Sequence, residues 1–376
     1  MAVTRAVEAL RIDEGRLSVE VARSFGSLPD EVIRFVDATS RNPFMRIAWL
    51  TCWYAVYLPA GWTEHVVVLR RGVDLVAVAP LVVHRIGPVR FFRFAGHGLG
   101  NYLDIIAPEE DRAPAISALL RHVAAARPSV LEWHDLNSES PSAHLVPGRC
   151  ARLYSNPRAI FGDDWDTHFR ATVADRKDRR RLTRKCELLE QHGQVTHVPE
   201  VLAADEKLFA EIRDLHRRRF AGTPNPLLQD RFWTFLGRLA RMSLGRDLVI
   251  SLLRLDERLI SVLVGMRADR TFVSYMLAFE PSLARYSPGH VHVLRQQQYF
   301  INAGWHALDF SKGDDFYKRR WSNGATANWD HILGYGLLGR PVAALLRVRS
   351  RLVAWAREKG LTRKLRRMRS RRVRLG

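Results

Sequence analysis

The chain has 376 residues, 47% of them hydrophobic, which suits two packed domains of ordinary size. No stretch approaches the roughly 18–20 uninterrupted apolar residues of a membrane span. The N-terminal sequence MAVTRAVEALRIDEGRL carries charges where a secretory signal needs an apolar core. The three cysteines lie far apart without CxxC or Cys/His spacing, which argues against a disulfide framework and a zinc site. We therefore expect a cytoplasmic globular protein without a bound metal.

The first half of the chain begins with short β-branched and aromatic runs. In residues 64–96, EHVVVLRRGVDLVAVAPLVVHRIGPVRFFRFAG, the breaks RRG and IGP predict an antiparallel meander. The segment APAISALLRHVAAAR follows with helical spacing, and the strand-like run VLEWHDL begins at Val130. The predicted order is meander, helix, strand.

A connector is predicted next, because Pro, Gly and Ser are frequent in residues 137–150 and 155–164. A charged helix is predicted from Trp165 to Gln191, and two more helical stretches precede Asp247. We therefore place a domain boundary at residue 150.

The second half repeats the order of the first. The runs DLVISLLRL, LISVLVGMR and TFVSYMLAF, joined by the turns DER and ADR, predict another meander. A helix from His290 to Ala303 follows, ended by Gly304 in the position that favours a left-handed cap. The strand-like run HALDF comes next. The sequence thus predicts two α/β domains, residues 1–150 and 151–335, followed by a basic segment, residues 336–376.

The tetrapeptide YSPG precedes the predicted helix of the second half. The Ser287 side chain can accept a hydrogen bond from a free backbone N–H, and Pro288 occupies a position where its missing N–H is not needed. Gly289 allows a close approach to the backbone. The N–H groups of Gly289, His290 and Val291, together with the positive end of the helix dipole, predict an anion site. A plain helix cap is the alternative interpretation.

This order of elements resembles the GNAT-type N-acetyltransferase fold. The run YSPGHVHVLRQQQYFINAGWHALDFSKGDDFYKRRW resembles the C-terminal motif of the CelD/BcsL family of acetyltransferase-like proteins, associated with bacterial exopolysaccharide and cellulose production. That family is similar to the Fem peptidyltransferases in having two such domains in tandem. The likeness spans about residues 40–335 and includes NPFMRIAWLTCWYAVY, LVAVAPLVV, GHGLGNYLDII and DRKDRRRLTRKCELLEQHG. The turn RYSPGH departs from the usual Q/R-x-x-G-x-G/A signature by having fewer glycines.

The resemblance implies tandem domains with mixed, mostly antiparallel sheets, and acetyl-CoA or another acyl-CoA as co-substrate. It implies that the turn holds the pyrophosphate of the coenzyme, through Tyr286, Ser287, Gly289, His290 and Val291. The corresponding entry in the first half, APEEDRAP, is acidic and would repel a pyrophosphate. The N-terminal domain is therefore predicted to be degenerate.

Acyl transfer to an amine needs a base for the amine proton and often an acid for the departing thiolate. Asp309 is a candidate base or orienting group, with a bond to the strand end as the alternative. Tyr317 is the candidate acid, because the fold that the chain resembles commonly has a tyrosine near the thiol; core packing is its alternative. Lys318 is a candidate cation for a phosphate or carboxylate, with a solvated helix face as the alternative.

Two further groups are candidates for binding the acceptor. Asn101, Tyr102 and Asp104, from GHGLGNYLD, are expected to face the cleft between the domains. The second group recurs at three- and four-residue intervals, which predicts one helical face suited to the phosphates of a nucleotide-linked or lipid-linked sugar. Its members are Lys177, Arg180, Arg181 and Arg184. A solvated helix face is the alternative for this group.

The basic excess lies mainly at the C-terminus. From Arg340 onward there are 14 Lys and Arg against one Glu, a net +13 of the chain's +20. Apolar side chains among these cations predict a basic amphipathic helix able to lie on an anionic membrane, or else a solvated or disordered tail. They are Val342, Leu345, Leu346, Val353 and Trp355.

The resemblance, together with these candidate residues, implies an acyl-CoA-dependent N-acyltransferase that acts on an exopolysaccharide or cell-envelope precursor. Its acceptor is a small-molecule or lipid-linked sugar, and the tail would hold the enzyme near the inner membrane. The alternatives are Fem-like aminoacyl transfer from tRNA to a peptidoglycan precursor and a non-catalytic membrane or nucleic-acid adaptor. No helix-turn-helix, zinc finger or RNP-type signature is present, so no specific nucleic acid is expected.

Overall fold

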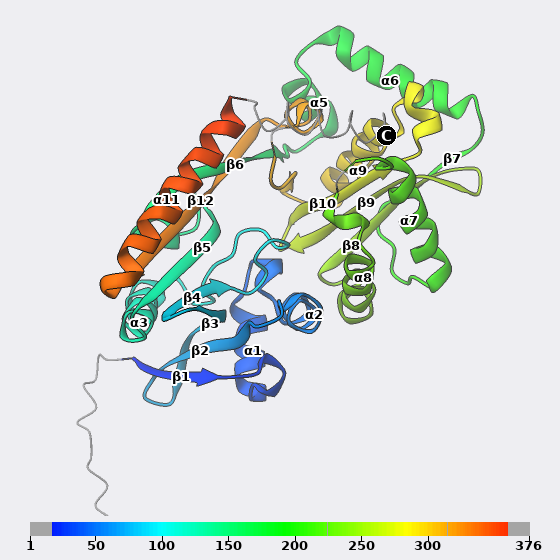
Figure 1. Ribbon diagram of the computed structural model, residues 1–376. Coiled ribbons are helices and arrows are strands. Elements are labelled where there is room, and N and C mark those ends of the chain that lie inside the picture. The colour runs from blue at the N-terminus through cyan, green and yellow to red at the C-terminus, as the bar shows by residue number, and fades with distance from the viewer. Residues whose placement is uncertain (1–16, 224, 314, 360–376) are drawn as a thin grey trace, which may run out of the picture.

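Within residues 17–223, 225–313 and 315–359, which the computed structural model describes, twelve strands form one mixed sheet (Figure 1). Along the chain they are β1 (Ser18–Ala22), β2 (Thr63–Arg71), β3 (Asp74–Ile86), β4 (Val89–Phe94), β5 (Ser129–Asn137), β6 (Arg149–Ile160), β7 (Val195–Val198), β8 (Leu248–Leu255), β9 (Arg258–Ala268), β10 (Thr271–Phe279), β11 (Ala307–Asp309) and β12 (Gly324–Tyr335). The order across the sheet is β1-β2-β3-β4-β5-β12-β6-β11-β10-β9-β8-β7.

Helices flank this sheet along its length (Figure 1). The α-helices are α1 (Asp30–Thr39), α2 (Ile47–Tyr57), α3 (Arg112–Ala125), α4 (Ser142–Leu145), α5 (Trp165–Thr172), α6 (Arg176–Glu190), α7 (Glu206–Arg219), α8 (Asp230–Ser243), α9 (Pro288–Asn302), α10 (Phe316–Arg320) and α11 (Gly336–Glu358). The 3₁₀ helices are η1 (Phe25–Ser27), η2 (Pro43–Met45), η3 (Pro226–Leu228) and η4 (Pro281–Tyr286). None of these helices has the length and apolar character needed to cross a bilayer.

The predicted repeat of meander, helix and strand is present in both halves. In the first half β2, β3 and β4 are antiparallel, and β5 returns parallel to β4. In the second half β8, β9 and β10 are antiparallel, and β11 returns parallel to β10. A parallel return needs a crossover connection, which α3 and α9 supply. The predicted fold class, tandem α/β units with a mostly antiparallel sheet, is confirmed.

The predicted helix from Trp165 to Gln191 is wrong in one respect, because the structure divides it into α5 and α6. Asp175 begins the second helix, and its carboxylate accepts hydrogen bonds from the amides of Lys177 and Asp178. An Asp N-cap satisfies first-turn donors that would otherwise lack partners. The sequence ADRKD carries this signal, but the continuous charge pattern around it favoured a single helix.

Two long strands connect the halves of the sheet. β12 lies between β5 of the first half and β6, and β6 in turn pairs with β11 of the second half. The halves also share a core, since Trp49 of α2 contacts Phe235 of α8 edge-to-face with ring centroids 4.8 Å apart. The sheet and the core therefore pass across the predicted boundary at residue 150 without a break.

The last helix, α11, lies along β12 and β6 (Figure 1). Val342 and Leu346, which the sequence assigned to a membrane-facing stripe, instead pack on a cluster that includes Phe91 and Val130. Their neighbour Leu345 is 70% exposed. Of the predicted basic segment 336–376, residues 360–376 lie outside the described residues.

Close contact between α11 and the sheet depends on glycine. A Cβ atom on Gly339 would collide with the backbone of Ser129 in β5. We expect Gly339→Ala to lower the free energy of unfolding by about 1–3 kcal/mol, because the helix must move away from the sheet. Thermal and urea denaturation would measure the change. Gly237→Ala is the matched control: its Cβ meets only the Arg241 guanidinium, at 3.9 Å, so no loss is expected, and equal losses in both variants would contradict this account.

Candidate functional site

The sheet opens where β10 and β11 separate. Their parallel pairing joins Thr271–Val273 to Ala307–Asp309, and β10 then continues to Phe279 beyond the end of β11. The pairing of β10 with β9 is irregular between Ser274 and Met276. Such bulges redirect a strand locally and are common beside active sites. A cavity of about 700 Å³ lies along this part of β10.

Segments far apart in the sequence line this cavity. α7, the connector after it, β10, the start of α9 and α10 all contribute side chains. Ser287, Gly289, His290, Tyr317 and Lys318, five of the residues selected from the sequence, meet here. Their predicted functional roles stay predictions, but their proximity is a property of the fold.

The start of α9 differs from the predicted cap. Ser287 is the N-cap residue, as predicted, but it has the left-handed backbone conformation (φ 56°) and its side chain makes no capping hydrogen bond, so the predicted side-chain cap is wrong. Its carbonyl instead accepts from the amides of His290 and Val291, at 2.9 and 3.2 Å. These two amides are therefore engaged within the first turn. Tyr286 and Val291 pack in an apolar cluster beside α6, away from the cavity lining.

His290 is a neutral hydrogen-bond donor at this helix start. Trp321 donates from Nε1 to His290 Nδ1 over 2.9 Å, so the ring proton of the neutral imidazole resides on Nε2. Burial, Arg320 and Arg181 lower the pKa of His290 to about 4, which keeps it neutral at pH 7. The Arg320 side chain is 9% exposed, and among the described residues its Nε has no hydrogen-bond partner. This end of α9 thus combines an imidazole N–H with two nearby guanidinium groups.

α10 supplies a phenol and an amine to the cavity. Burial and, secondarily, the charge of Asp315 raise the pKa of Tyr317, so its hydroxyl stays protonated over the physiological range. Burial lowers the pKa of Lys318 to about 8, against the opposing effects of Asp315 and Asp309. Lys318 Nζ donates to the carbonyl of Lys312 over 2.6 Å. The cavity therefore holds a phenol that can donate a proton beside an amine that titrates near neutral pH.

Comparison with known proteins identifies the second half. Residues 176–319 match the model of the acetyltransferase (GNAT) domain. The chain contains a GNAT acetyltransferase domain. Its fold is similar to that of FemX, with a TM-score of 0.56 and 12% identity over 87% of this chain and 100% of that chain. The structure of L-PGS from Bacillus licheniformis is also similar, with a TM-score of 0.54 and 13% identity over 87% of this chain and 96% of that one. No curated protein sequence matches.

Asp309 lies beside the cavity of the GNAT domain but does not line it. The side chain is 1% exposed. It accepts from Tyr102 Oη at 2.8 and 2.9 Å, from Arg158 Nε at 2.8 Å and from the Ser311 amide at 2.7 Å. Because these donors occupy both oxygens, the carboxylate holds strands and loops together and is poorly placed to take a proton from an acceptor.

The other first-half candidates lie away from the cavity. Asn101 is buried, and Asp104 is held by Arg112 at 3.1 Å and by Ser140. Of the three, Tyr102 alone contacts the GNAT domain in the described structure, through Asp309. The partners of Asp104 belong to its own half, so the expected common cleft for these residues stays a prediction.

The cations of α6 do not share one surface as predicted. Arg180 and Arg184 line a separate groove of about 400 Å³ between α5 and α6. Arg181 lies on the side near His290 and pairs with Asp178 at 3.2 Å, while Lys177 does not line the groove. The three- and four-residue spacing therefore selected basic residues on two adjoining faces of α6. No group of three His, Cys, Asp or Glu in the described ranges could hold a metal ion.

Sequence reasoning missed two ionisable residues of α7 that line the cavity. The guanidinium of Arg219 lies 4.3 Å from the ring centroid of Phe279. His216 is fully buried, and burial lowers its pKa to about 4. The run HRRRF gives no signal for either role, because the position of α7 against β10 depends on long-range packing.

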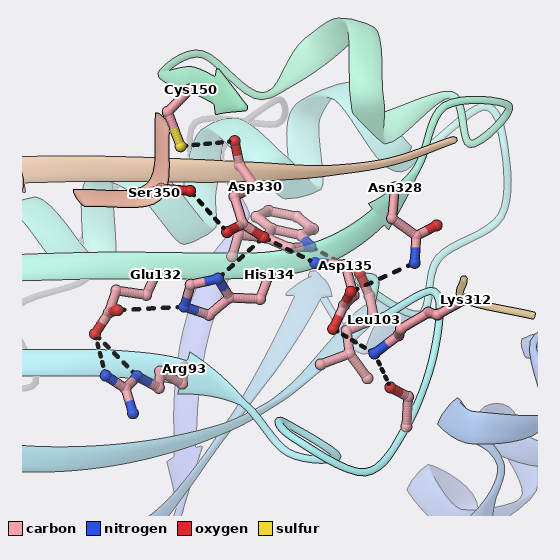
Figure 2. Close-up of polar contacts among 12 residues, drawn as sticks. Arg93, Leu103, Glu132, His134, Asp135, Cys150, Lys312, Asn328, Asp330 and Ser350 are labelled. Atoms are coloured by element: carbon pink, nitrogen blue, oxygen red, sulfur yellow. Dashed lines mark hydrogen bonds and ion pairs between the residues drawn. The ribbon is translucent and has the colours of Figure 1, made fainter. Parts of the chain in front are cut away.

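A buried polar network supports the loop that precedes α10. Figure 2 shows Lys312 against Asp135, with Nζ and Oδ2 2.6 Å apart, and His134 between Glu132 and Asp330. Hydrogen bonds and the charges of these two carboxylates raise the pKa of His134 to about 9 despite burial. The first half thereby positions the carbonyl of Lys312, which accepts from the Lys318 amine.

This network predicts a pH dependence of stability. The pKa of His134 is about 9 in the folded chain and 6.5 ordinarily, so its stabilisation is complete below pH 6.5 and lost as pH rises through 9. We expect the contribution of His134 to the free energy of unfolding to fall by about 1–2 kcal/mol between pH 6.5 and 8. Urea denaturation of the unchanged chain and of His134→Gln across this range would isolate that contribution, because the buried histidines whose pKa values are lowered titrate in both chains. The difference in unfolding free energy between the two chains should shrink by this amount as pH rises, and a constant difference would assign the effect to another group.

Proposed function

We propose that the cavity beside β10 is the site at which an acyl group passes from acyl-CoA to an amine. The single observation that carries this proposal is the meeting of the α9 N-terminus, Tyr317 and Lys318 where β10 and β11 separate. A site of this kind needs an anion-binding end, a proton donor and a proton acceptor around one channel. The described residues of the GNAT domain supply all three.

The residues around α9 fit the diphosphate of a coenzyme. Ser287, Gly289 and His290 line the cavity, and Arg320 and Arg181 act on His290 electrostatically. Within the described ranges the buried Nε of Arg320 has no acceptor, while Nη2 of the same side chain pairs with Asp178 Oδ2 at 2.8 Å. Because buried donors normally have acceptors, this Nε supports an anion near His290. In this proposal His290 donates a hydrogen bond from Nε2 to the diphosphate. Gly289 has no side chain and therefore leaves room beside Phe279. Bound acyl-CoA supplies the reactive thioester.

In this proposal Lys318 and Tyr317 each carry out one of the two proton transfers of the reaction. A lysine with a pKa of about 8 is neutral in about a tenth of molecules at pH 7 and can take a proton from the acceptor amine. The Tyr317 hydroxyl, protonated because its pKa is raised, can donate to the departing sulfur. The structure thus favours Lys318 over the fully bonded Asp309 as the base.

The acceptor in this proposal is an amine on an exopolysaccharide or cell-envelope precursor, either a small molecule or a lipid-linked sugar. The resemblance to the CelD/BcsL family supports the sugar, and the groove formed by Arg180 and Arg184 suits its phosphates. The fold likeness to FemX favours a second function, transfer of an aminoacyl group from tRNA. Co-purification of tRNA with the full chain would support the second function over the first.

Calorimetric titration with acetyl-CoA tests the proposed donor. We expect micromolar binding, about −8 kcal/mol, in the full chain. Gly289→Asp should abolish it by placing a carboxylate among the proposed phosphate ligands. Gly289→Ala is the control, because it adds the same Cβ at 3.0 Å from Phe279 without the charge. Absence of binding in the unchanged chain would reject acetyl-CoA as the donor, and equal losses in both variants would indicate a steric cause.

The pH dependence of turnover tests the proposed base. If the neutral amine of Lys318 accepts the proton, kcat/KM should rise with pH through an apparent pKa near 8. Lys318→Arg keeps the positive charge but cannot lose it, so we expect turnover to fall by about 10²–10⁴. An active Lys318→Arg enzyme would instead show that Lys318 acts as a permanent cation. Tyr317→Phe should lower kcat without moving this pKa.

A further inference from the structure

The helix α11 has two apolar faces, and only one of them is covered. Val342, Ala343 and Leu346 pack on the sheet, and Ser350 donates to Asp330 Oδ2 over 3.2 Å, as Figure 2 shows. Arg347 and Arg351 extend this attachment by donating to the carbonyls of Ile332 and Cys150. The helix is therefore fixed along its length, and its rotation about its own axis is set.

The uncovered face forms a continuous apolar stripe. Positions 338, 345 and 352 recur at intervals of seven, as do 348 and 355, so they align along one side of the helix. Their side chains, with that of residue 337, are between 48% and 95% exposed. The stripe consists of Leu337, Leu338, Leu345, Val348, Leu352 and Trp355. Monomeric proteins rarely leave such a contiguous apolar patch in water.

Cations border the stripe on both sides. At about 100° per residue, Arg349 falls on one side of it and Arg340 and Arg351 on the other. All three side chains are exposed, and the chain beyond Lys359 adds eight Lys or Arg without an acidic residue. Apolar residues flanked by arginines are the arrangement of helices that lie in a bilayer interface, with cations at the anionic headgroups. We propose that the stripe of α11 binds the surface of an anionic lipid bilayer.

Charge argues against a second copy of the chain as the occupant. Two copies joined along the stripe would bring Arg340, Arg349 and Arg351 of both helices together, in a protein of formal charge +20. An anionic membrane neutralises the same groups. The proposal stands apart from the acyl-transfer site, since none of the stripe residues lines that cavity.

Sedimentation of the full chain with vesicles tests the proposal. We expect binding to vesicles of equal parts phosphatidylglycerol and phosphatidylcholine, and at least tenfold weaker partitioning to phosphatidylcholine alone. Leu345→Ser combined with Leu352→Ser should lower partitioning to the anionic vesicles at least tenfold. Leu202→Ser is the matched control, because Leu202 is 78% exposed and lies outside α11. Equal partitioning of the double variant and the unchanged chain would overturn the proposal.

A chain that ends at Lys359 distinguishes the contribution of the stripe to vesicle binding from that of the basic residues that follow it. This shortened chain should bind anionic vesicles more weakly, and the two serine substitutions should weaken it further. If removal of residues 360–376 abolished vesicle binding and the serine substitutions had no effect on it, the membrane contact would belong to residues 360–376 and the proposal for the stripe would be rejected. A dimer in light scattering that the double variant converts to monomer, without a change in vesicle binding, would establish a second copy as the occupant instead.

Trp355 provides a readout that does not depend on partitioning. It is 53% exposed in the stripe, so brominated phosphatidylglycerol should quench part of the tryptophan fluorescence of the bound protein. Trp355→Phe should remove most of that quenching while leaving sedimentation nearly unchanged. Quenching that persists undiminished in this variant would show that the stripe does not enter the bilayer.

Discussion

The position of the cavity depends on one buried carboxylate. Asp309 ends β11 at the last residue that pairs with β10, and it joins Tyr102 of the first half, Arg158 of β6 and the amide of Ser311. Tyr102 and Ser311 both have positive φ values, 61° and 57°, which cost about 1–3 kcal/mol each in residues other than glycine. Hydrogen bonds from both residues to the same charge offset that strain. Removing one partner of a buried ion pair typically costs about 3–5 kcal/mol, so the three segments are held together strongly.

The same constraint explains the unusual amine in the cavity. Ser311 begins the loop whose Lys312 is held by Asp135, and the carbonyl of Lys312 accepts from Lys318. Burial lowers the Lys318 pKa from 10.5 to about 8, although Asp315 and Asp309 act in the opposite direction. That shift corresponds to about 3 kcal/mol against the charged form. Desolvation therefore exceeds the attraction of both carboxylates, because the nearer aspartate is exposed and Asp309 is already neutralised by Arg158.

Local patterns in the sequence were sufficient to predict the repeat of meander, helix and strand, because hairpin turns and apolar periodicity are properties of neighbouring residues. The placement of β12 between β5 and β6 was not predictable in this way, since it joins residues that lie far apart in the sequence, from Gly324 with Arg158 to Tyr335 with Ser129. The same limit applied to the site. Gly289, His290, Tyr317 and Lys318 adjoin one motif and were selected from the sequence. Arg219 and His216, which line the same cavity, come from a helix that only tertiary packing brings to β10. The hydrogen bonds that make Asp309 a poor candidate for the base were not predictable for the same reason, since its partners Tyr102 and Arg158 are distant in sequence.

The arginines of α11 have two physical roles, since some attach the helix to the sheet and others border its exposed face. An arginine-rich helix would ordinarily stay in water, yet Arg347 turns inward and donates to a carbonyl of β12, and the exposed Arg351 donates from Nε to a carbonyl of β6, so both assist the attachment of α11 to the sheet. Glycine at 334 and 339 permits the close approach that makes these hydrogen bonds possible. Because the inward face of α11 is fixed to the sheet, the helix cannot rotate to bury the leucines of its outward face. The apolar stripe is therefore a consequence of how firmly the opposite face is bound.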